Sequence, residues 1–396
     1  MKKSLLLSIA ASAVVFAGGD IAPVQPVQPT AAPAACDFWG TLALRYDTQK
    51  IEDGFKGGAH DNKFFKGDDK GALALVMGVE KELGYGFGFG AELAGMITVD
   101  HKFNKTGETA ELSQLYLTYK AGNTAIKAGR QALPKAVSPL AWSDRTAGVL
   151  ERAYNGVVVV NTDITDTTLV GAWVRSVTDT AHSTKLGKNG LFMLGAINKS
   201  IANTTLSFAG YYVKDLANDL ATTNVTAGTS DYVSVWAAAE TKVSDVNLGL
   251  QLVYAKAKGQ DKTLGVAGYA GTNFNGLDVK LTLAYLNDGN SNIAFSNPNS
   301  GSGFWGASYY VFGGNVKAGN KQKIAKLDLG YKIDGYGKVY AGVAADKPDT
   351  GKTAIAARVG YDFKVMDVNA KIEYRFAKDF GGKKAHRIRV QGVYKF

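Results

Sequence analysis

The sequence predicts an all-β protein: a transmembrane, antiparallel, up-and-down β-barrel of eighteen strands with long outer loops. Three observations predict it. The final segment, 385–396, alternates apolar and cationic residues, strand-like runs are joined by connections that alternate between short and long, and aromatic residues sort by strand direction. Composition agrees, with 47 Gly, 19 Tyr and 18 Phe against 8 Pro and 5 Met. Alternating membrane strands produce this mixture of apolar and polar residues.

The last segment carries the clearest alternation. Successive side chains of a strand point to opposite faces, so one face here is apolar and the other is cationic. The two faces comprise Ile388, Val390, Gly392, Tyr394 and Phe396 on one side, and Arg387, Arg389, Gln391 and Lys395 on the other. A soluble sandwich would bury the apolar face, whereas a membrane barrel would turn it to lipid and line a watery lumen with the arginines.

The N-terminal region precedes the barrel. Residues 1–17 are predicted to be a signal peptide, because Lys2 and Lys3 come before an apolar run and a small-residue cleavage site. Residues 18–37 form a Pro/Ala-rich spacer, in which the only cysteine, Cys36, is interpreted as an incidental thiol. Residues 38–396 are assigned to the barrel, and they contain no run of about 18 apolar residues that could form a spanning helix.

Strand-like runs with turn residues between them follow in order. We expect strands at 38–47, 71–82, 85–97, 111–120, 123–130, 152–162, 167–177, 191–199, 203–213, 231–241, 245–257, 263–272, 276–287, 322–333, 336–346, 352–363, 367–377 and 385–396. Short links such as Asp334-Gly335 alternate with long ones such as 131–151 and 288–321. Short periplasmic turns and longer outer loops are typical of outer-membrane barrels. Whether 288–321 covers the mouth or contains another strand is left open.

Aromatic residues provide an independent indication of strand direction. On strands that run outward the apolar face ends in residues such as Tyr285 and Tyr374, and on returning strands it ends in residues such as Tyr331 and Phe396. Two aromatic girdles result, which suits side chains that lie between lipid and water. A β-sandwich would not sort its aromatic residues in this way.

The opposite parity then defines the lumen. It carries ten cationic side chains, which we interpret as pore-lining residues that favour anions: Arg45, Lys127, Lys280, Lys326, Lys338, Arg358, Lys371, Arg375, Arg387 and Arg389. Five carboxylates share this parity: Asp47, Asp278, Asp328, Asp362 and Glu373. Guanidinium groups bind carboxylates through two parallel hydrogen bonds, so such a wall can select anionic solutes. The alternative is a solvated wall whose charges pair with one another.

Four sequence segments are distinctive: Ala17-Gly-Gly-Asp-Ile-Ala-Pro-Val, Asp37-Phe-Trp-Gly-Thr-Leu, Gly129-Arg-Gln-Ala-Leu-Pro and Tyr154-Asn-Gly-Val-Val-Val-Val-Asn-Thr-Asp. Together they resemble segments of the Opr-type (OprD-like) porins of the bacterial outer membrane. The resemblance implies an eighteen-stranded barrel with the third loop folded inward as a constriction, a basic ladder in the lumen, and a location in the cell outer membrane. Within that loop, Asp144, Arg145, Glu151 and Arg152 place both charge signs together. They are the expected constriction residues, or else solvated charges of an ordinary outer loop.

The expected function is therefore passive diffusion of small hydrophilic solutes and ions, with a preference for anions or carboxylates. The alternative is a closed structural or adhesive surface barrel. The formal charge of +10 is spread singly along the strands, which does not favour nucleic acid as a partner; outer-membrane lipid is expected, and a homotrimer remains open. No enzyme activity, metal or cofactor is expected, because His60, His101, His182 and His386 lack neighbours at metal-ligand spacing.

Overall fold

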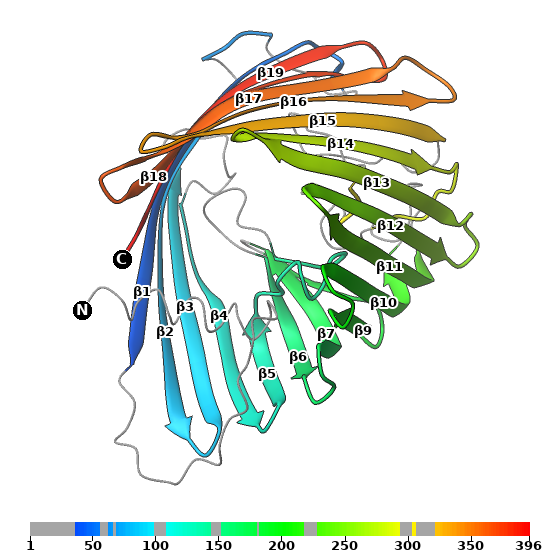
Figure 1. Cartoon of the computed structure of the whole chain (residues 1–396). Helices are drawn as coiled ribbons and strands as arrows, with labels where there is room; N and C mark the ends of the chain where they lie inside the picture. The colour runs from blue at the N-terminus through cyan, green and yellow to red at the C-terminus, as the bar shows by residue number, and fades with distance from the viewer. Residues whose placement is uncertain are drawn as a thin grey trace.

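A computed structural model gives the fold as one closed β-barrel (Figure 1). The residues that the structure describes are 36–55, 62–65, 69–98, 108–143, 152–179, 182–217, 228–293, 303–305 and 321–396. The predicted signal peptide and nearly all of the predicted spacer lie outside these ranges. No helix in the described ranges is long and apolar enough to cross a membrane.

Every strand pairs antiparallel with its neighbours. The strands are β1 (Asp37–Ile51), β2 (Lys70–Gly84), β3 (Phe87–Thr98), β4 (Glu108–Ala121), β5 (Thr124–Gln131), β6 (Ala153–Asn161), β7 (Thr167–Asp179), β8 (His182–Lys185), β9 (Leu191–Asn198), β10 (Thr204–Ala217), β11 (Thr229–Val243), β12 (Val246–Ala257), β13 (Thr263–Phe274), β14 (Leu277–Leu286), β15 (Gln322–Ile333), β16 (Gly337–Pro348), β17 (Ala354–Val365), β18 (Val368–Lys378) and β19 (Lys384–Lys395). The ring closes where β1 pairs with β19 from Thr41 opposite Lys395 to Ile51 opposite Ala385.

The eighteen expected strands are all present, and they form the eighteen-stranded ring. Their ends differ from expectation by a few residues; β1, for example, continues to Ile51 rather than ending at residue 47. One short strand was not expected. The long loop 178–190 contains β8, which pairs back on the outer end of β7, while β9 takes the next place in the ring beside β7. His182 therefore begins a strand and does not lie in a loop.

Alternation divides the wall into an apolar exterior and a buried interior face. On β12, Leu250 and Leu252 are 53% and 55% exposed, whereas Gln251 and Val253 are 0% and 2% exposed. Leaving such leucines in water would forgo roughly 1.5–3 kcal/mol per side chain. A continuous exterior of this kind matches the hydrocarbon of a bilayer, so the strand parity predicted from the sequence is confirmed as the parity of a membrane barrel.

The two ends of the barrel differ. The start of β1, the end of β19 and the short turns, such as Tyr85-Gly86 and Asn275-Gly276, lie at one end, which is the periplasmic end in barrels of this class. The exterior aromatic residues lie near the two ends: Tyr285 and Tyr374 toward the outer end, and Tyr331, Tyr394 and Phe396 toward the periplasmic end.

The third outer connection, between β5 and β6, folds into the barrel over its described part. The hydroxyl of Tyr211, on the interior face of β10, accepts a hydrogen bond from the Leu140 N–H at 3.2 Å and lies 3.2 Å from the Ser138 hydroxyl. Leu133 and Leu140 are each 1% exposed and pack against interior residues of the wall. The expected inward fold of this loop is therefore present in residues 132–143.

A second connection, between β14 and β15, also enters the barrel. Gln251 on β12 donates a hydrogen bond to the Gly303 carbonyl at 2.8 Å and accepts one from the Trp305 N–H at 2.8 Å. Thr263 on β13 likewise donates to the Ser291 carbonyl. The described parts of 288–321 thus line the interior as irregular chain, and the alternative that they add a strand is not supported there.

Candidate functional site

One wall of the lumen holds most of the expected cations. Nine of the ten lie on β1 and on β14 to β19, which are consecutive in the ring, and Lys127 lies on β5. Adjacent strands place these side chains about 5 Å apart across the sheet, so their charges form one field and not isolated points. We refer to the nine residues as the basic wall: Arg45, Lys280, Lys326, Lys338, Arg358, Lys371, Arg375, Arg387 and Arg389.

Asp47 is the centre of the outermost ion-pair group in this wall. Both hydrogen bonds from Arg389 reach it, Nε to Oδ1 at 2.7 Å and Nη2 to Oδ2 at 3.0 Å. Arg45, two residues earlier on the same face of β1, also donates to Asp47 through Nε and Nη2. One buried carboxylate therefore holds two guanidinium groups, which leaves this group with a net positive charge.

Glu373 on β18, the strand that pairs with β19, likewise contacts two arginine side chains. Arg375 donates to both of its oxygens, at 2.6 and 3.1 Å, and an amino nitrogen of Arg387 lies 3.9 Å away. The Tyr340 hydroxyl completes the group by donating to Glu373 at 3.1 Å. Again a single buried carboxylate is shared by two arginines, which leaves a net positive charge.

The periplasmic half of the wall contains looser pairs. Arg358 donates to Asp328 at 2.8 Å, Lys338 to Asp278 at 2.8 Å, and Lys371 lies 3.5 Å from Asp362. These side chains are about a quarter to a half exposed. Exposed pairs of this kind contribute little stability.

The remaining three cations rest on aromatic or backbone groups. The ammonium group of Lys280 lies 3.5 Å from the ring centre of Tyr269, and that of Lys127 lies 3.5 Å from the ring centre of Tyr116. Lys326 donates to the carbonyl of Trp305 at 2.8 Å, so the inward segment is attached directly to the basic wall. Ring faces and carbonyls stabilise a cation without cancelling its charge.

A polar cavity of about 600 Å³ opens beside these residues. Its lining includes five cations of the basic wall, Lys280, Lys338, Arg358, Lys371 and Arg375, together with Asp278, Asp328, Asp362 and Glu373. The cations and carboxylates alternate across neighbouring strands. The cavity can thus hold a small charged solute in water between groups of both signs.

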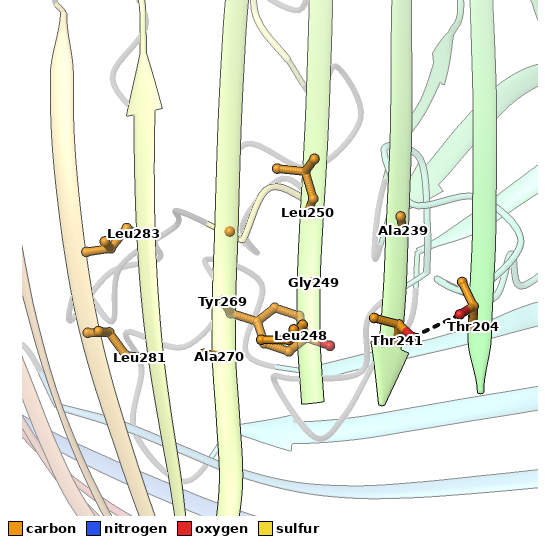
Figure 2. Close-up of a pocket in the computed structure, with 11 residues that line it drawn as sticks. Thr204, Ala239, Thr241, Leu248, Gly249, Leu250, Tyr269, Ala270, Leu281 and Leu283 are labelled. Carbon is orange, nitrogen blue, oxygen red and sulfur yellow. Dashed lines mark hydrogen bonds between the residues drawn. The ribbon is translucent and has the colours of Figure 1, made fainter. Parts of the chain in front are cut away.

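A second cavity, of about 560 Å³, lies on the lipid side of β10 to β14. Figure 2 shows Leu248, Leu250, Leu281 and Leu283 around it, with the hydroxyls of Thr204 and Thr241 2.9 Å apart at its lower edge. Its lining is apolar and offers no charged group. It belongs to the membrane-facing surface and not to the solute path.

One arrangement of interior side chains on three neighbouring strands was not predicted from the sequence, and it occurs three times in the periplasmic half of the lumen. A tyrosine lies directly opposite a glycine on the next strand, and its hydroxyl donates to a glutamate on the strand beyond. We call these groups the Glu-Gly-Tyr rows: Glu80, Gly90 and Tyr116; Glu240, Gly249 and Tyr269; Glu373, Gly360 and Tyr340. A methyl group on any of these glycines would overlap the tyrosine ring. The sequence offers one signal for such a row, namely a glycine at an interior position of a strand. Glycine there often marks a place where another group lies close to the backbone.

The expected constriction residues are only partly described. Asp144, Arg145 and Glu151 lie outside the described residues. Arg152 lies just before β6, and its backbone carbonyl accepts a hydrogen bond from the Ser143 hydroxyl at 2.5 Å. Within the described ranges no group of His, Cys, Asp and Glu side chains has an arrangement that would hold a metal ion.

No protein-family model matches the sequence, and no curated protein does either. Solved structures do share its fold. A BenF-like porin from Pseudomonas fluorescens Pf-5 is 15% identical with a TM-score of 0.71, over 91% of this chain and 98% of that one. The Pseudomonas aeruginosa outer membrane protein OpdK is 14% identical (TM-score 0.69, 91% and 98%), and OccAB4 of Acinetobacter baumannii is 12% identical (0.68, 92% and 98%).

These similarities show the fold. The resemblance to OprD-like porins noted in the sequence is confirmed at that level, over nearly the whole chain. This chain and the solved outer-membrane proteins share the closed barrel fold.

Proposed function

We propose that this chain is an outer-membrane porin through which small hydrophilic solutes and ions diffuse passively, with a preference for anions and carboxylates. The observation that carries the proposal is the basic wall, in which Asp47 and Glu373 are each shared by two arginines, so that positive charge is in excess. An anion that enters the lumen finds a positive field and N–H donors suited to carboxylate oxygens.

The structural neighbours support the same reading. OpdK of Pseudomonas aeruginosa has been solved with vanillate, an aromatic carboxylate. Passive diffusion requires no catalytic group, and the similar solved structures include a porin and an outer membrane protein. For this chain we propose the charge of the solute, which is negative, and not its identity.

A closed structural or adhesive surface barrel is the second candidate. The observation that favours it is that two connections fold inward, through Leu140 at Tyr211 and through Trp305 at Gln251. Such segments narrow the path, and if they closed it the barrel would pass no ions.

Conductance separates the two candidates. Detergent-purified protein inserted into planar bilayers should give discrete, stable conductance steps, and acetate or benzoate on one side should carry measurable current. Inserted protein that leaves the bilayer resistance unchanged would reject the porin and favour the closed barrel. Folding of the purified protein is verified by resistance of its gel band to unfolding in dodecyl sulfate without heating, and insertion by its co-flotation with lipid vesicles of the same composition.

A further inference from the structure

Lysines on the lipid-facing exterior gather at one end of the barrel. In the described strands of the ring, exterior lysines toward the outer end are Lys50, Lys214, Lys256, Lys323, Lys347, Lys378 and Lys384, whereas Lys81 alone has this parity toward the periplasmic end. An exterior that only had to be soluble in lipid would show no such asymmetry. The outer rim therefore carries a positive charge directed at the membrane and not at the pore.

Two pairs of these lysines lie directly opposite each other in the sheet. Lys323 on β15 faces Lys347 on β16, and Lys378 on β18 faces Lys384 on β19. Like charges in this relation destabilise a sheet unless an anion lies between them. No hydrogen bond or ion pair of the described residues involves the ammonium group of Lys323 or Lys347; Asp349, two residues beyond Lys347, lies 3.9 Å from the ammonium group of Lys321 instead.

The pairs lie at the depth where headgroups begin. Tyr285 of the outer aromatic girdle, Lys323 and Lys347 form a single row across β14, β15 and β16. On the other side of β17, Phe376, His386 and Lys50 form a corresponding row across β18, β19 and β1, with Lys378 and Lys384 one pleat further out. Aromatic side chains at this level mark the boundary between hydrocarbon and headgroups, so the ammonium groups reach the headgroup layer.

We propose that these five lysines, Lys50, Lys323, Lys347, Lys378 and Lys384, form an outer cation belt that binds the phosphate groups of outer-leaflet lipids. Two ammonium groups about 5 Å apart can share one phosphate, and three acceptor oxygens satisfy both through charge-assisted hydrogen bonds. The lipid then supplies the missing counter-charge of the Lys323–Lys347 pair. Beside the second pair, Glu52 accepts a hydrogen bond from the Lys384 backbone N–H and provides one negative charge. The belt thereby fixes the depth and the tilt of the barrel in the membrane.

The test measures lipid binding to the full-length protein in neutral detergent by native mass spectrometry. The probe is a bisphosphorylated glycolipid, lipid A, with its dephosphorylated form as the matched lipid and inorganic phosphate as a competitor. Lys323→Gln with Lys347→Gln is compared with Lys81→Gln with Lys199→Gln, which removes two lysines near the periplasmic end.

The belt predicts that the first double variant binds lipid A about tenfold more weakly, as expected for two lost lysine–phosphate contacts. The second double variant and the Lys323→Arg with Lys347→Arg variant should bind it like the wild type. Equal binding of the two lipids, an equal loss in both glutamine variants, or full competition by millimolar phosphate would overturn the proposal. If the first double variant does not fold, Lys347→Gln alone provides the same comparison.

Lipid binding and conductance are independent readouts. The glutamine variant at Lys323 and Lys347 should keep the wild-type single-channel conductance, because neither lysine faces the lumen. A barrel that fails to conduct but binds lipid A through these lysines would reject the porin and retain the belt.

Discussion

Asp47 and Arg389 lie directly opposite each other across the line where the barrel closes. They are 342 positions apart in sequence, yet two hydrogen bonds of 2.7 and 3.0 Å join them, with Asp47 only 1% exposed. The contact pairs the first strand with the last and at the same time belongs to the basic wall. Barrel closure and lumen charge therefore depend on the same carboxylate.

Replacing Asp47 by asparagine should weaken the closure and strengthen anion preference. Removing one partner of a buried ion pair commonly costs about 3–5 kcal/mol, and a cost of this size is expected here because Asp47 is only 1% exposed. We expect a lower unfolding temperature in detergent and a larger anion-to-cation permeability ratio, since Arg45 and Arg389 lose their shared negative charge.

The matched control is Asp334→Asn, in the turn between β15 and β16, where the carboxylate is 93% exposed. Asp334→Asn should change neither the unfolding temperature nor the anion-to-cation permeability ratio. Thermal unfolding of Asp47→Asn at the wild-type temperature would show that the closure does not depend on this group.

Gly249→Ala should destabilise the barrel through a Glu-Gly-Tyr row. The added methyl group would occupy the position of the Tyr269 ring, displacing it and breaking its 2.6 Å hydrogen bond to Glu240. Overpacking of this kind costs about 1–3 kcal/mol. Gly171→Ala is the same substitution at an exterior glycine with open space around it, and urea unfolding of the two should differ by that amount. Equal unfolding midpoints for the two variants would show that the Tyr269 ring does not restrict the size of the residue at position 249.

Tyr211→Phe should loosen the inward third loop. The variant keeps the ring but removes the hydroxyl that contacts the Leu140 N–H and the Ser138 hydroxyl. Single-channel traces should then show larger open-state noise and a conductance that is raised by a factor of about two or less. Tyr212→Phe, one residue away on the lipid-facing side, is the control and should behave as the wild type. Unchanged noise in both variants would show that this hydroxyl does not restrain the path.

Most of the wall was predictable from the sequence because strand parity has a period of two and lipid enforces it at every position. The alternation of lipid-facing Leu250 with interior Gln251 can be read from the order of the residues. The same order places Tyr285 and Tyr331 at opposite ends of the barrel. A one-residue error in a strand boundary does not disturb this pattern. The eighteen-stranded ring follows from it.

The parts that could not be predicted depend on contacts between strands. Nothing in the sequence pairs Gly249 with Tyr269, because that requires the register of β12 against β13. The same applies to Trp305 at Gln251, which joins a loop to a strand 54 positions earlier. Asp144, Arg145 and Glu151 lie outside the described residues, and their role at the constriction stays a prediction.

The reversal potential in a potassium chloride gradient tests the central claim most directly, since it reports which ion the basic wall favours. The wild-type channel should be anion-selective, and Arg375→Glu with Arg389→Glu should reduce or invert that selectivity. The exterior pair Lys81→Glu with Lys214→Glu, which changes the net charge equally, should leave it unaltered. A wild-type channel that passes potassium and chloride equally, or a lumen double variant with the wild-type reversal potential, would contradict the account.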